Sequence, residues 1–128
     1  MVILDTNIIV DHLRCQKGQE SCLTKIAKRF TKENLAISVI TVQELYEGKS
    51  SKEQQREDYL LATITPLKIL SYSYETAQMA GEIARDIKEP IEFADAAIAA
   101  TAIINGADLY TLNKKHFQNI KDLTLLEL

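Results

Sequence analysis

Short apolar runs alternate with longer stretches of helical periodicity along the whole chain. Strands are predicted from the apolar runs at residues 1–4, 35–38, 67–70 and 108–112, and the ending "LTLLEL" could add a fifth. Helices are predicted between them, at residues 8–14, 20–30, 42–48, 51–64, 75–88 and 92–105. Strands that alternate with helices indicate an α/β fold, in which a parallel sheet carries helices on both faces.

The helix predicted over residues 92–105 is unusual, because "FADAAIAATAIING" consists largely of alanine. Small side chains let a helix lie close to its neighbours, as a central buried helix must, and Gly106 stands where a helix commonly ends. A carboxylate inside such a segment is costly without a partner, so Asp95 needs an explanation.

The composition is that of an ordinary globular protein, and 128 residues predict one domain spanning residues 1–128. No apolar run approaches the ~20 residues of a membrane span, and no secretory signal is recognisable, so we expect a cytoplasmic protein without a membrane partner. The net charge of −3 argues against a protein that coats nucleic acid. It leaves room for an enzyme that acts on nucleic acid through a metal and a local basic surface.

Cys15 and Cys22 are the only cysteines. A helix would place them two turns apart, which is too far for a disulfide, and no CxxC pair or nearby histidine suggests zinc. We expect two half-buried free thiols.

Three acids stand at places where a parallel sheet puts its ligand site. Asp5 ends the first strand, Glu44 follows the second, and Asp95 begins the alanine-rich helix. All three segments can meet at the carboxyl-end edge of the sheet, where Thr111 and Asn113 also follow the fourth strand. Converging carboxylates raise one another's pKa unless a cation lies between them, and oxygen ligands without cysteine or histidine suit Mg²⁺ or Mn²⁺.

Each acid also has an ordinary interpretation. Asp5 could cap the helix that follows it, and Glu44 could close a capping box that begins at Thr41. Asp95 would gain ~0.3–1 kcal/mol from the dipole of its own helix. Taken singly, these interpretations are as good as a metal site; taken together, three such acids in one parallel α/β chain favour the metal site.

Three segments resemble, in order, the signature blocks of the PIN-domain nucleases, and most closely the VapC-type toxins of toxin–antitoxin pairs. They read "VILDTNIIVDHL", "ISVITVQELYEG" and "IEFADAAIAATAIINGADLYTLNKKHF", and the resemblance runs from Met1 to about Leu126. It implies a three-layer α/β/α sandwich with a central parallel sheet of four to five strands. It also implies an endoribonuclease that uses Mg²⁺ or Mn²⁺ and leaves 5′-phosphate and 3′-hydroxyl ends.

Carried over residue by residue, the resemblance makes Asp5, Glu44 and Asp95 the metal-binding catalytic acids. Asn113 matches a fourth catalytic position that is often aspartate in the family, so one negative charge is missing here, which weakens the case for a second metal. Further polar residues would hold the acids or a water molecule. These are Asn7, Thr111 and, as the weaker companion, Thr6, whereas Ser38 and Thr41 are expected to cap a helix.

Basic side chains at the rim would contact RNA. The candidates are Arg14, Arg85, Lys88, Lys114 and Lys115. Neither histidine is expected to converge on the acids: His12 is predicted on the solvent side of a helix, and His116 at the surface or on a phosphate. Phe117 is expected to anchor a short helix after the fourth strand.

The resemblance further implies an RNA substrate, a homodimer, and a cognate antitoxin that inserts a segment into the active-site groove. Two alternatives remain open from the residues: a PIN-like module that binds RNA or protein without cutting, and a nuclease of RNA maturation outside toxin–antitoxin pairs. Degenerate members usually lose one or more acids, so the presence of all three favours an enzyme. A receiver domain would need two acids after the first strand, and a dehalogenase-like phosphatase a DxD, where this chain has "DTN".

Overall fold

The computed structural model describes residues 1–128 and contains one parallel sheet of four strands in the order β3-β2-β1-β4. The strands are β1 (Val2–Leu4), β2 (Leu35–Ser38), β3 (Lys68–Leu70) and β4 (Asp108–Tyr110). The α-helices are α1 (Thr6–Arg14), α2 (Cys22–Ala27), α3 (Val39–Glu47), α4 (Gln54–Ile64), α5 (Tyr74–Asp86), α6 (Phe93–Ile104) and α7 (Lys114–Phe117). Two 3₁₀ turns, η1 (Lys32–Asn34) and η2 (Lys49–Lys52), complete the chain.

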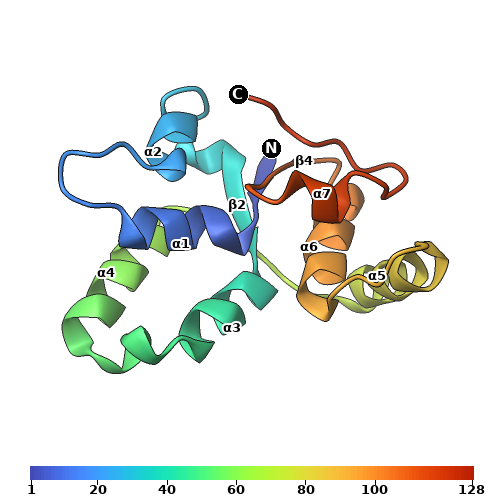
Figure 1. Cartoon of the computed structure of the whole chain (residues 1–128), viewed down its shortest axis with the longest axis horizontal. Coiled ribbons are helices and arrows are strands. Elements are labelled where there is room, and N and C mark those ends of the chain that lie inside the picture. The colour runs from blue at the N-terminus through green and yellow to red at the C-terminus, as the bar shows by residue number, and fades with distance from the viewer.

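Helices cover the sheet on both faces, which confirms the predicted α/β class and its three layers. Val2 and Leu4 pack in one apolar cluster with residues of α1, α2 and α4, whereas Ile3 packs in a second cluster with residues of α6 and α7. This split follows from the alternation of side chains along a strand. Figure 1 shows the two groups of helices on opposite sides of the strands, with α1, α2 and α4 on one side and α5, α6 and α7 on the other.

The alanine-rich helix α6 is central and buried, as its composition predicts. Seven consecutive residues, 96–102, are buried. Ala99 and Ala102 pack with Ile3 of β1, and Ala96 and Ala100 pack with α5, so small side chains allow close approach on two sides. Gly106 follows the helix with a φ of 61°, a conformation that glycine adopts without steric cost.

Several predicted helix boundaries are wrong. Helix α3 begins at Val39 rather than at residue 42, because the hydroxyl of Ser38, the last residue of β2, accepts the Ile40 N–H at 3.0 Å and starts the helix there. The capping box at Thr41 is therefore also wrong, and Glu44 lies inside the helix. Helix α2 covers only Cys22–Ala27, since Ser21 caps it by accepting the Thr24 N–H and a turn follows Ala27.

The expected fifth strand is reduced to a single bridge. Leu109 of β4 is bridged in parallel to Leu125, and its N–H and C=O pair with Thr124 and Leu126. No further residue of the C-terminal segment forms a bridge with β4, so the sheet has four regular strands. Helix α1 also begins earlier than predicted, at Thr6.

Both cysteines are free and half-buried, as expected. None of the helices combines the length and the apolar character needed to cross a membrane.

His12 does not face solvent freely, which corrects the prediction for it. Its Nδ1 lies 2.6 Å from the Ser21 hydroxyl oxygen, and its Nε2 lies 3.2 Å from the Tyr59 hydroxyl oxygen. One imidazole thus joins α1 to the start of α2 and to α4. Its partial burial lowers the pKa of His12 below the ordinary value of 6.5.

We expect this imidazole to make the fold less stable in acid. Because its pKa is lowered in the folded chain, the unfolded chain binds the proton more readily, so stability is present above about pH 6.5 and is lost as the pH falls below that value. Thermal unfolding midpoints between pH 8 and 5.5 test this for wild type and for His12→Gln, which keeps a polar side chain without the titration. The advantage of wild type should shrink as the pH falls; parallel pH profiles would contradict the role of His12.

Candidate metal-binding site

The carboxyl-end edge of β1 and β4 is the place where this topology opens a ligand site. From β1 the chain adds β2 and β3 on one side, and it then returns to add β4 on the other side of β1. Open α/β sheets bind ligands in the crevice at such a reversal, beyond the carboxyl ends of the strands. The residues that follow β1 and β4 are therefore the first to consider.

Asp5 lies at this reversal and is 5% exposed. Its N–H donates to the Tyr110 carbonyl, which continues the pairing of β1 with β4. Its carboxylate accepts the Thr6 N–H at 2.8 Å and the Thr111 hydroxyl at 2.6 Å. Asp5 therefore follows the end of β1 and also caps α1, which confirms the ordinary interpretation of this residue as a helix cap.

Burial raises the pKa of the Asp5 carboxyl, and the negative charge of Asp95 raises it further. The hydrogen bonds from Thr111 and Thr6 act in the opposite direction but do not cancel the effect of burial. An ionised carboxylate at this position is therefore disfavoured within the chain alone, and a cation would favour it.

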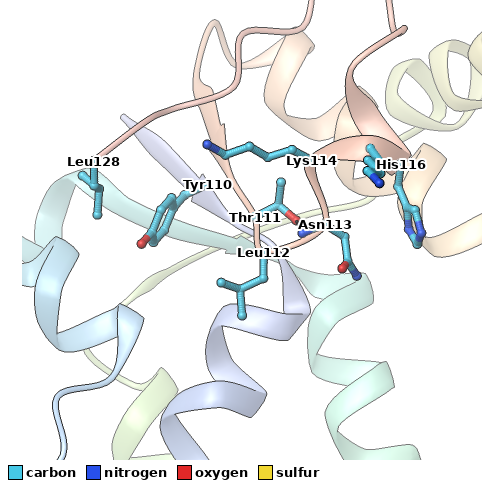
Figure 2. A pocket seen from close by; sticks show the side chains of 8 residues that line it. Tyr110, Thr111, Leu112, Asn113, Lys114, His116 and Leu128 are labelled. Carbon is cyan, nitrogen blue, oxygen red and sulfur yellow. Dashed lines mark hydrogen bonds between the residues drawn. The ribbon is translucent and has the colours of Figure 1, made fainter.

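Thr111 organises the loop that follows β4. Because its hydrogen goes to Asp5, its oxygen accepts the Asn113 N–H at 3.0 Å and the Asn7 amide at 3.4 Å. The side-chain amide oxygen of Asn7, Oδ1, accepts the Leu112 N–H at 3.3 Å, which ties the same loop to the start of α1. Figure 2 shows the side chains of Asn113 in this loop and His116 in α7 extending in similar directions, whereas Lys114 extends sideways, away from both.

Glu44 is joined to the start of α1 by a threonine. The Thr6 hydroxyl donates to the Glu44 carboxylate at 2.6 Å. Since that hydrogen is used, the Thr41 hydroxyl must donate to the Thr6 oxygen, 2.9 Å away. Thr41 is fully buried and does not cap a helix, so its predicted capping role is wrong. Thr6, which was expected to contribute less than Asn7 and Thr111, holds Glu44 directly.

Asp95 lies in the first turn of α6, where the helix dipole favours its charge by ~0.3–1 kcal/mol. Burial outweighs this benefit and raises the pKa of Asp95, with further contributions from Glu92 and Glu44, while His116 lowers it. The imidazole Nδ1 of His116 lies 3.3 Å from Asp95 Oδ2. The expectation that neither histidine approaches the acids is therefore wrong for His116.

Asp95 is within electrostatic reach of both Asp5 and Glu44, yet the three acids do not form a compact cluster. Asp95 affects the pKa of Asp5, and Glu44 affects that of Asp95. No three His, Cys, Asp or Glu side chains are gathered closely enough to hold a metal ion as they stand. The donors are carboxylate oxygens without cysteine, a set that fits Mg²⁺ or Mn²⁺.

The basic candidates differ in their surroundings. Lys115 lines a cavity of about 240 Å³ with Asp95 and His116, and Arg14 lines one of about 610 Å³ with Glu44. Lys114 pairs with Glu127 at 2.9 Å and lines the cavity of about 550 Å³ in Figure 2.

The other two basic candidates lie apart from these cavity walls. Arg85 forms a two-pronged ion pair with its neighbour Asp86 at the end of α5. Lys88 is exposed in the segment between α5 and α6. Neither lines the cavities that contain Asp95, Glu44 or Thr111.

His116 is the polar residue at this edge that sequence reasoning missed. The sequence held a signal for this contact. In a parallel α/β fold the helix before β4 begins at the carboxyl-end edge of the sheet, and the residues after β4 lie at the same edge, so His116 and Asp95 could be expected to lie near each other. Phe117 is 1% exposed and anchors α7 as predicted, which places the neighbouring His116 beside the start of α6.

Comparison with known proteins gives consistent matches over nearly the whole chain. The PIN domain family matches residues 2–123. "Ribonuclease VapC19" of Mycobacterium tuberculosis is 33% identical over 96% of this chain and 97% of its own length. "Ribonuclease VapC1" of Methanocaldococcus jannaschii is 28% identical over 97% of this chain and 84% of its own length.

Solved structures agree with the sequence relatives. VapBC2 from Rickettsia felis, bound to a DNA fragment from its promoter, matches with a TM-score of 0.84 and 29% identity, covering 100% of this chain and 99% of that one. VapBC-1 from nontypeable Haemophilus influenzae matches with a TM-score of 0.80 and 27% identity, covering 99% and 98%.

Proposed function

This chain belongs to the PIN domain family and resembles its VapC ribonucleases, and from that premise we propose that it is a metal-dependent endoribonuclease and the toxin of a toxin–antitoxin pair. The observation that carries the proposal is the position of Asp5. Its buried carboxylate lies where the strand order reverses, is held by Thr111 from β4, and has a raised pKa that a cation would offset.

Asp5, Glu44 and Asp95 would hold Mg²⁺ or Mn²⁺. When bound, such an ion supplies Lewis acidity, which activates water and neutralises charge on a phosphate. The chain itself fixes the orientation of the acids: Thr111 holds Asp5, and Thr6, supported by Thr41, holds Glu44. Carboxylates held in this way lose little freedom when a ligand arrives, which favours its binding.

The remaining polar residues would position the RNA strand. We propose that Lys115 and Arg14 contact its phosphates, because each shares a cavity with one of the acids. Lys114 would first have to exchange its ion pair with Glu127, and Arg85 its pair with Asp86, so both are weaker candidates. Asn113 offers a neutral amide at the fourth catalytic position.

The reaction would be hydrolysis by in-line attack of water on an RNA phosphodiester. The water oxygen forms a bond to phosphorus, and the bond from phosphorus to the 3′ oxygen breaks. That oxygen takes a proton and leaves as the 3′-hydroxyl, while the phosphate stays on the 5′ oxygen. The 2′-hydroxyl takes no part, so no cyclic phosphate forms.

We expect the products of cleavage to carry 5′-phosphate and 3′-hydroxyl ends. A mixed RNA pool cut by the purified chain in Mg²⁺ can be tested by enzymatic ligation and by end-labelling, with pancreatic-type ribonuclease products as the reference for cyclic ends. Products with 2′,3′-cyclic phosphates would contradict water as the nucleophile. Tight RNA binding with no product at all would favour a non-cutting module.

Its protein partner is a cognate antitoxin, as the structures of related toxin–antitoxin complexes support. We further propose that the chain forms a homodimer and that it acts in the cytoplasm, where it would meet RNA. The oligomeric state can be measured by sedimentation of the purified chain with and without its antitoxin.

A further inference from the structure

The contact between His116 and Asp95 joins two elements that are far apart in the sequence. Asp95 lies at the start of α6, and His116 lies on α7, beyond β4. The Nδ1 atom of the imidazole is 3.3 Å from Oδ2 of the carboxylate, and Asp95 is the only protein carboxylate that this ring pairs with. The other carboxylate oxygen, Oδ1, accepts no hydrogen bond from the chain.

The position of the imidazole is fixed by its helix. Phe117, the next residue, is 1% exposed and packs with Ile98 and Ala102 of α6. The His116 N–H donates to the Asn113 carbonyl at 3.0 Å, which closes the turn at the start of α7. The short helix that carries His116 is therefore held against the same helix that carries Asp95.

A carboxylate acceptor selects the form of histidine that carries a hydrogen on Nδ1. In that form the Nδ1 hydrogen faces Oδ2 across the 3.3 Å contact, and Oδ1 is left for another partner. Carboxylates that bind metal ions are commonly held by such hydrogen bonds, and these outer partners affect metal affinity. The His116 side chain remains 57% exposed, so it holds Asp95 without closing the site.

We propose that His116 is a positioning residue, which orients the Asp95 carboxylate through the contact of its Nδ1 with Oδ2 so that the second oxygen can bind a divalent cation. This inference rests on the proposed function, since it assumes that Asp95 is a ligand of that cation. The expected effect of removing His116 on the affinity for the cation is opposite in sign to that of removing a positive charge. Removing a cation beside an anionic site tightens cation binding, whereas removing an orienting hydrogen bond weakens it.

The test is calorimetric titration of the purified chain with Mn²⁺ at pH 7.5, which measures binding without any turnover. His116→Ala should raise the Kd roughly 10- to 100-fold. His116→Asn places an amide N–H near the position of Nδ1 and should restore most of the affinity. Lys115→Ala removes a neighbouring cation from the same cavity, so its Kd should stay equal to that of wild type or fall.

The outcomes separate the inference from the proposed function. If wild type binds Mn²⁺ and His116→Ala binds it equally well or more tightly, the positioning role is wrong. If His116→Asn binds Mn²⁺ as weakly as His116→Ala, the Nδ1 contact is not the cause of the tighter binding, and the proposal also fails. If wild type binds no Mn²⁺, the metal site itself is wrong, and the role of His116 falls with it. Circular dichroism melts of each variant establish that the fold is intact.

Discussion

Asp5→Asn should reduce RNA cleavage by more than about 100-fold, because a lost metal ligand should cost more than the 10- to 100-fold typical of an outer-shell partner. The substitution keeps the shape of the side chain and an oxygen that can accept from Thr111 or from the Thr6 N–H. It removes the charge that would hold the cation. Initial rates on a labelled RNA in Mg²⁺ measure the effect.

The same substitution should leave the metal-free protein at least as stable as wild type. Burial raises the pKa of Asp5, so at pH 7 its ionisation opposes folding, and a neutral amide removes that cost. Asp58→Asn is the matched control, since Asp58 is exposed on α4 and bonds only to Gln54. If both variants retain wild-type cleavage, or if Asp5→Asn is inactive only because it unfolds, the proposed role of Asp5 as a metal ligand needed for cleavage is wrong.

Phe117→Ala should destabilise the chain by about 3–5 kcal/mol, a large part of the 5–15 kcal/mol typical of a whole domain. Phe117 is the only buried residue of α7, which has four residues and gains little from its own hydrogen bonds. The aromatic ring packs between α6 and α7, so its loss leaves a cavity and frees α7, which carries His116, together with Asn113 at its start.

Urea unfolding measures this change as a shift of the midpoint at constant slope. Phe93→Ala is the control, because that residue is 73% exposed and its ring lies at the surface beside Tyr72. We expect the control to change the free energy of unfolding by less than about 0.5 kcal/mol. Equal losses in the two variants would show that α7 is not held by Phe117.

The elements whose signals are local were predictable from the sequence. The residues of β2 match the predicted strand, because an apolar run of four ends at a serine that starts the next helix. The burial of α6 followed from its alanines. The start of α3 was missed because two residues, Ser38 and Thr41, could each cap it, and only the course of the chain after β2 decides between them.

The site was predictable as far as topology determines it. Asp5 and Thr111 meet because β1 and β4 are neighbours at the point where the strand order reverses. The Thr6 to Glu44 hydrogen bond and the His116 to Asp95 contact depend on how helices pack, and no spacing along the sequence encodes that. The sequence therefore named the three acids, together with Thr111 and Thr6 as residues that would hold them. The structure added which acid each threonine holds, and it added the contact of His116 with Asp95.

The central claim is that these acids bind a divalent cation on which RNA cleavage depends. It is tested most directly by stripping the purified chain with EDTA, removing the chelator, and measuring cleavage of a mixed RNA pool as Mg²⁺ is added back. The account predicts no cleavage without the ion and a saturable recovery as it is restored. Cleavage at the full rate in excess EDTA would contradict it.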